Sequence, residues 1–72
     1  SFEAASTDFR FAASVAEFGM LLRESPYRGE SSFDHVLSTA ERSRGADRNG
    51  YRNEFLELVR KARALRGFRQ EQ

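Results

Sequence analysis

Apolar residues recur every three or four positions in three separate segments of the chain. The first segment, over about residues 8–24, carries one such stripe, at Phe11, Val15, Phe18 and Leu22. This spacing is the period of one helical face. Pro26 follows closely, and the residue before a proline avoids the α region. We therefore predict a first helix over about residues 8–24, with Gly19 allowing another helix to approach.

The second segment covers about residues 32–44. Its apolar residues again follow a single helical face, at Phe33, Val36, Leu37 and Ala40. Gly45 is a typical helix stop signal. A helix of only about three turns is marginal in water, so we expect this one to depend on packing.

The third segment covers about residues 48–66. Asp47 is the best candidate for its N-cap, because a carboxylate there accepts amide hydrogens and meets the positive end of the helix dipole. The stripe that follows consists of Tyr51, Phe55, Leu58, Ala62 and Leu65, widened by Val59. Gly67 is expected to end the helix.

No segment alternates apolar and polar residues as a strand does. The predicted fold is therefore all-α, a compact three-helix bundle over residues 8–67, with a linker at 1–7 and a frayed tail at 68–72. The expected core consists of Phe11, Val15, Phe18, Leu22, Phe33, Val36, Leu37, Phe55, Leu58, Val59 and Ala62.

Composition narrows the class of protein. Seventy-two residues suffice for one small domain, and a deep catalytic pocket is not expected at this size. The chain has no cysteine, which excludes disulfides and cysteine-ligated metal. The net charge of +1 conceals an acidic first part and a basic C-terminal part of the chain. Residues 1–41 carry three basic and seven acidic side chains, whereas residues 58–72 carry five basic and one acidic.

The candidate chemistry is sparse. Asp47-Arg48-Asn49-Gly50 resembles the centre of an EF-hand, but the loop lacks two anchoring ligands, so we interpret it as an N-cap followed by a turn. His35 is the single histidine and has no partners at metal-ligand spacing. No nucleophile or phosphate-loop motif is present. We therefore predict no catalytic residue, no metal ligand and no cofactor.

Two kinds of binding remain open. The basic end of the third helix, at Arg60, Lys61, Arg63 and Arg66, is a candidate surface for an acidic partner. Tyr27 in the first loop suits a protein interface. The alternative is a small nucleic-acid-binding helical module, but the pI of about 8.2 is low for one. The second loop is also longer than a helix-turn-helix turn.

Two strings carry a family resemblance. They are DFRFAASVAEFGMLLRESPY at residues 8–27 and GYRNEFLELV at residues 50–59. Both resemble the C-terminal region of bacterial von Willebrand factor type A domain proteins of the YfbK-like kind. The resemblance covers about residues 8–62.

The resemblance implies a role that the residues alone do not. It implies that a von Willebrand factor A domain with a metal site lies upstream. These 72 residues contain neither that domain nor its metal-binding motif, Asp-x-Ser-x-Ser. The resemblance also implies a bacterial cell envelope or exported protein. We therefore expect a non-catalytic docking module, whose partner is another protein or the parent chain's own upstream domains. Neither nucleic acid nor membrane contact is expected.

The charged residues in the resembling strings suggest a hypothesis about register. Arg10 and Glu54 are not needed by the apolar stripes of their own helices. We expect them to form an ion pair between the first and third helices.

Overall fold

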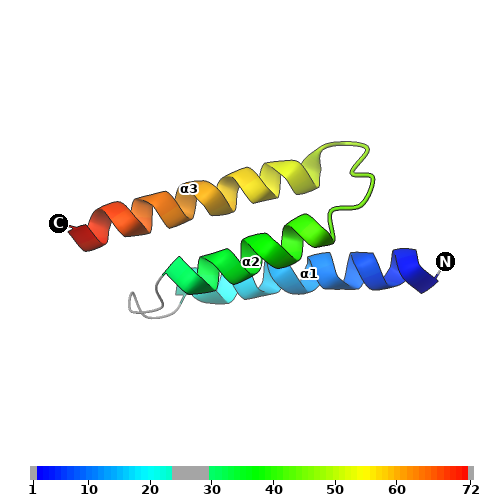
Figure 1. Ribbon diagram of the computed structural model, residues 1–72, viewed down its shortest axis with the longest axis horizontal. Helices are drawn as coiled ribbons and strands as arrows, with labels where there is room; N and C mark the ends of the chain where they lie inside the picture. Colours follow the sequence, from blue (N-terminus) through cyan, green and yellow to red (C-terminus); the bar gives the residue numbers. More distant parts are fainter. Residues whose placement is uncertain (1, 24–29, 72) are drawn as a thin grey trace.

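Three α-helices make up the chain in the computed structural model, which describes residues 2–23 and 30–71. α1 spans Phe2–Arg23, α2 spans Glu30–Arg42 and α3 spans Tyr51–Glu71. Successive helices run in opposite directions, so α1 and α3 point the same way (Figure 1). The predicted all-α three-helix bundle is confirmed, and no β-strand occurs in the described ranges.

α2 is the central helix, because it packs along both of its neighbours. Its four apolar side chains are at most 6% exposed, at Phe33, Val36, Leu37 and Ala40. The single apolar face predicted for this segment is therefore entirely buried. This burial supplies the packing that so short a helix needs.

An aromatic cluster joins the three helices. The ring of Phe55 in α3 packs edge-on against two rings of α1, Phe11 at a centroid distance of 5.4 Å and Phe18 at 5.5 Å. Phe18 also meets Phe33 of α2 at 6.2 Å. Edge-to-face geometry is favourable for aromatic pairs, at about 0.5–1.5 kcal/mol beyond the area that they bury. The cluster thus brings α3 into direct contact with α1.

The helices differ in length, and this difference sets the shape. α1 has 22 residues and α3 has 21, whereas α2 has 13. At a rise of about 1.5 Å per residue, α2 is more than 10 Å shorter than either neighbour. The N-terminal part of α1 and the C-terminal part of α3 extend past α2 at opposite ends (Figure 1). The molecule measures 47 × 19 × 16 Å.

The boundaries of the helices differ from those predicted. α1 begins at Phe2 rather than at residue 8, so Phe2–Thr7, which we assigned to a linker, form its first turns. Thr7 consequently lies inside the helix, where its side chain is close to Gly45 of the α2–α3 loop. α2 spans Glu30–Arg42 rather than residues 32–44, and Gly45 beyond it takes a φ of 64°, as a stop signal does.

The C-terminal boundary was also wrong. α3 runs to Glu71, so most of the predicted frayed tail at 68–72 is helical. Gly67 does not take the positive φ with which a glycine ends a helix. Tyr27 and Pro26 lie outside the described residues.

The predicted core is right for α2 but is rotated on the other two helices. Val15, Leu22 and Leu58 are 42%, 55% and 55% exposed, so their prediction as core residues was wrong. Leu21 and Leu56 are buried in their place. The remaining predicted residues hold: Phe11, Phe18, Phe33, Val36, Leu37 and Val59 are buried, and Phe55 and Ala62 pack against them.

A serine explains the rotation on α1. Ser14 is 1% exposed and occupies a core position between Phe11 and Phe18. Its hydroxyl donates to the Phe11 carbonyl at 2.7 Å. Because that bond satisfies the hydroxyl, the serine can be buried at little cost. The buried stripe is therefore 11, 14, 18 and 21 rather than 11, 15, 18 and 22.

We expect Gly19→Ala to stabilise the protein. A Cβ built at Gly19 meets nothing within 4 Å, so the expected close approach of another helix is wrong. Alanine in a helix interior is favoured over glycine by about 0.5–1 kcal/mol. Urea unfolding should show a gain of that size. The control is Gly45→Ala, which should lose stability because residue 45 has a φ of 64°. A loss for Gly19→Ala would contradict the structure.

Candidate functional site

The predicted basic end of α3 is largely engaged by α2. Arg60 Nη2 donates to Glu41 Oε1 at 2.9 Å, and Arg63 pairs with Asp34. All four side chains are between 38% and 58% exposed, so each pair contributes only about 0–1 kcal/mol. Lys61 is exposed. Of the four cations predicted to form a free surface, two are therefore neutralised by carboxylates of α2.

Arg66 is held differently. Its guanidinium carbon lies 5.2 Å from the centroid of the Phe33 ring. Its Nη1 atom is buried and has no hydrogen-bond partner among the residues that the structure describes. Leaving a buried donor without an acceptor costs about 1–3 kcal/mol, and more for a charged group. An acceptor from outside the described residues would remove that cost.

Beside Arg66, an apolar groove runs between α1 and α3. A hollow of about 370 Å³ there has Leu22 on one wall, Leu65 and Ala62 on the other, and Phe33 of α2 beneath. Leu22 and Leu65 are 55% and 65% exposed. We call this surface the α1–α3 groove.

Two more exposed side chains extend the α1–α3 groove toward the aromatic cluster. Val15 lies four residues after Phe11, and Leu58 lies three residues after Phe55, so each is on the side of its helix that faces the other. Val15 is 42% and Leu58 55% exposed. Of the residues that the sequence pattern marked as core and that the structure exposes, Leu22 lines the hollow itself, and Val15 and Leu58 lie about two turns before Leu22 and Leu65 on the same sides of their helices.

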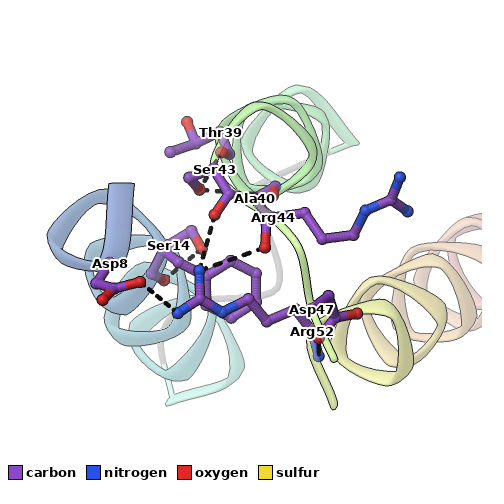
Figure 2. A network of polar contacts seen from close by, with 9 residues as sticks. Asp8, Ser14, Thr39, Ala40, Ser43, Arg44, Asp47 and Arg52 are labelled. Atoms are coloured by element: carbon purple, nitrogen blue, oxygen red, sulfur yellow. Dashed lines mark hydrogen bonds and ion pairs between the residues drawn. The ribbon is translucent and has the colours of Figure 1, made fainter. Parts of the chain in front are cut away.

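At the opposite end, Arg52 ties all three helices together (Figure 2). Its Nη1 donates to the carbonyl oxygens of Ser43 at 3.0 Å and Arg44 at 3.4 Å, just past the end of α2. Its Nη2 donates to Asp8 Oδ1 of α1 at 2.7 Å. Its guanidinium carbon also lies 4.7 Å from the centroid of the Phe11 ring. One side chain therefore satisfies carbonyls that the helix end leaves free and anchors α1 to α3.

The side chain of Asp47 caps the start of α3, as predicted, but from four residues before the first helical residue rather than from the position next to it. Its two carboxylate oxygens accept the amide hydrogens of Arg52 at 2.9 Å and Asn53 at 3.0 Å. The amide of Gly50 donates to the Asp47 carbonyl at 3.0 Å, which closes a turn. The helix consequently starts at Tyr51, three residues later than predicted.

A second hollow, of about 620 Å³, lies around this turn and includes Asp8 and Asp47. Both carboxylates are already bonded, to Arg52 and to the α3 amides. Nowhere in residues 2–23 and 30–71 do three His, Asp or Glu side chains gather as metal ligands would. None of the described helices is long and apolar enough to span a membrane.

The Arg10–Glu54 ion pair does not form among the described residues, and the α1–α3 pair is Asp8–Arg52 instead. Residues two apart on a helix point about 200° apart, so Arg10 and Glu54 face away when Asp8 and Arg52 face each other. This pair was missed from the sequence because Asp8 was placed at the start of the first helix, whereas α1 begins at Phe2.

His35 also takes part in a pair between helices. Its Nδ1 lies 2.9 Å from Glu17 Oε1, which joins α2 to α1. The His35 side chain is 65% exposed, and within residues 2–23 and 30–71 no third ligand accompanies these two. The pair therefore has the character of a surface contact that aligns the two helices.

The comparison with protein families decides where the chain belongs. Residues 1–65 match the family described as "Uncharacterized protein YfbK, C-terminal". The chain belongs to the YfbK C-terminal family. The resemblance noted in residues 8–27 and 50–59 is thereby confirmed.

A curated relative agrees with this assignment. The chain is 41% identical over 56 residues to "Uncharacterized protein YfbK" of Escherichia coli (strain K12). The alignment covers 78% of this chain and 10% of the relative, so the chain spans about a tenth of the relative's length. No solved structure matches the chain significantly. The family places the chain as a C-terminal region and indicates no catalytic family.

We expect Arg52→Ala to destabilise this YfbK C-terminal region far more than Asp8→Asn does. The first change removes bonds to three helix-terminal or charged groups and should cost about 2–3 kcal/mol. The second removes one ion pair, whose Asp8 side chain is 67% exposed, and should cost less than about 1 kcal/mol. Urea unfolding of both variants measures the difference. Equal losses would show that the carbonyl contacts of Arg52 contribute nothing.

Proposed function

We propose that the chain is the non-catalytic C-terminal docking module of a longer, von Willebrand factor A-containing protein, and that its α1–α3 groove receives an acidic amphipathic helix. The observation that carries the proposal is the groove itself. Apolar residues with core spacing line it, and they are about half exposed. The expected cell-envelope location is part of the same proposal.

The apolar lining supports a helical occupant. Leu22 and Leu65 on the two walls, and Leu58 about two turns before Leu65 on the same side of α3, are each more than half exposed. Burying a leucine fully contributes about 1.5–3 kcal/mol, so covering these three would stabilise a complex appreciably. An amphipathic helix binds in such a groove by inserting apolar side chains from every third or fourth position.

The charges support an acidic occupant. Arg66 borders the groove with a buried Nη1 that has no acceptor. Lys61 is exposed nearby on the same helix. A carboxylate on the occupant would complete the hydrogen bonding of Arg66, and charge-assisted bonds of this kind are among the stronger ones.

The occupant that we propose is a helix from the upstream part of the same polypeptide. The matched relative has about nine-tenths of its length outside the aligned region, since the alignment covers 10% of it. A segment of the same chain is present at high effective concentration, so a groove of modest area suffices to hold it.

The alternative function, nucleic-acid binding, loses support from the contacts of α3. Arg60 and Arg63 are paired with carboxylates of α2 and would have to leave them to bind phosphate. A phosphate-binding surface normally presents several free cations at once.

We expect the upstream part of the full-length protein, added as a separate polypeptide, to bind the 72-residue chain. Leu65→Gln and Leu58→Gln should each weaken binding about tenfold, because each replaces apolar contact worth about 1.4 kcal/mol or more. Arg66→Gln should weaken it by a similar factor. Isothermal titration calorimetry measures all three.

The matched control is Met20→Gln. Met20 is 54% exposed, as Leu58 is 55% exposed, but it lies on the side of α1 away from the groove. Its substitution should leave the affinity unchanged. Absence of binding, or equal losses for Met20→Gln and Leu58→Gln, would overturn the proposal. Salt-sensitive binding of duplex DNA that the Arg60 and Arg63 substitutions abolish would favour the alternative.

A further inference from the structure

α1 has a second apolar face, opposite the one that it buries. Phe9 and Phe18 are nine residues apart, which is two and a half turns, so they point in opposite directions. Phe18 is 6% exposed, whereas Phe9 is 75% exposed. Phe2 and Met20 lie on the same side as Phe9 and are 88% and 54% exposed. Contiguous exposed apolar surface of this kind commonly marks an interaction site.

Small residues fill the space between these large ones. The outer face of α1 consists of Phe2, Ala5, Phe9, Ala12, Ala13, Ala16, Met20 and Arg23, all of them exposed. It contains no acidic residue. It is separate from the α1–α3 groove, whose α1 wall is formed by Val15 and Leu22.

The order of large and small residues on the outer face is self-complementary. Reading the helix backwards from Arg23 pairs every member of the face with another member, at positions whose numbers add up to 25. The resulting pairs are Phe2 with Arg23, Ala5 with Met20, Phe9 with Ala16, and Ala12 with Ala13. Each bulky apolar side chain thus meets an alanine or the stem of an arginine.

This pattern fits a two-fold axis. In a symmetric antiparallel pair of helices, position i of one copy faces position j of the other and position j faces position i. Alanines at the centre let two helix axes approach to about 8 Å. Phe9 of each copy would then occupy the space above Ala16 of the other.

The flanking charges agree with the same register. Arg10 and Glu17 are seven residues apart and lie on the same flank of α1. In the antiparallel pair, Arg10 of one copy is within two residues, or about 3 Å along the axis, of the level of Glu17 of the other. Arg10 is exposed, and none of the ion pairs among the described residues involves it. Glu17 contacts His35 of its own copy and is 32% exposed, so Arg10 of the other copy would share its carboxylate with His35. Charge complementarity therefore favours a second copy over an unrelated apolar surface.

We propose that two copies of the chain associate through the outer face of α1, antiparallel and two-fold symmetric, with the axis between Ala12 and Ala13. Phe9 packs on Ala16 and Met20 packs on Ala5 across the interface. The α1–α3 groove of each copy remains open to its own occupant. The chain is thereby a dimerisation module as well as a docking module.

Sedimentation equilibrium of the chain over a concentration series tests the association. A reversible dimer is expected. Ala12→Glu places a charge at the two-fold axis and should weaken the dimer at least about tenfold. Ala64→Glu is the matched control, since Ala64 is an exposed helical alanine of α3. It should leave the dimer unchanged, as should Leu65→Gln in the groove.

Two results would overturn the proposal. The first is a monomer at every concentration, and the second is a dimer that Ala12→Glu leaves intact while circular dichroism shows an unchanged helix content. Neither result bears on the groove, because binding of the upstream part is measured with Leu58→Gln and Leu65→Gln.

Disulfide trapping tests the direction of pairing, since the chain has no cysteine of its own. A mixture of an Ala5→Cys copy and a Met20→Cys copy should form a mixed disulfide rapidly under mild oxidation. Either variant alone should link at least about tenfold more slowly, because positions 5 and 5 lie at opposite ends of an antiparallel pair. Rapid linking of Ala5→Cys with itself would indicate parallel helices and overturn the antiparallel arrangement.

Discussion

The short central helix is the constraint on which the rest of the structure depends. α2 has 13 residues, and all four of its interior apolar side chains are at most 6% exposed. Two longer helices cover it, and each is longer than α2 by a little more than two turns. Because α2 cannot reach those turns, parts of α1 and α3 keep apolar surface that this chain alone does not bury. The α1–α3 groove, with Phe33 of α2 beneath it, and the outer face of α1, which points away from the core, add further exposed apolar surface.

Polar side chains close the ends that the aromatic cluster does not reach. Arg52 bonds the carbonyls that follow α2, and Asp47 bonds the first free amides of α3. These groups have no intrahelical partner and would otherwise depend on water. At the other end Arg66 lies over Phe33, but its Nη1 atom has no acceptor in the described part of the chain. The polar groups at one end of the bundle thus bond to each other, whereas at the other end the buried Nη1 donor of Arg66 is left without an acceptor from the described residues.

The sequence predicted the three helices, the buried face of α2 and the cap at Asp47, because each depends on local spacing or on one residue type. It did not predict the orientation of α1 and α3. A buried Ser14 interrupts the apolar stripe, and its acceptability depends on a hydroxyl bond to the Phe11 carbonyl that no pattern reveals. Arginines on the interior side of α3 likewise look like solvent-facing charge. Arg52 and Arg66 are interior because rings of Phe11 and Phe33 lie beneath them.

Several residues that were wrongly predicted to be in the core form exposed apolar surface. Val15, Leu22 and Leu58 have the spacing of buried residues, and they are 42–55% exposed. Phe9 and Met20 make the opposite side of α1 apolar as well. A helix that is apolar on both sides is characteristic of an element buried within a larger assembly. A domain of this size also buries a smaller share of its surface than a larger one does. The apolar residues of α1 and α3 therefore fit two kinds of contact. One set packs inside the bundle, and the other set is available for contacts outside it.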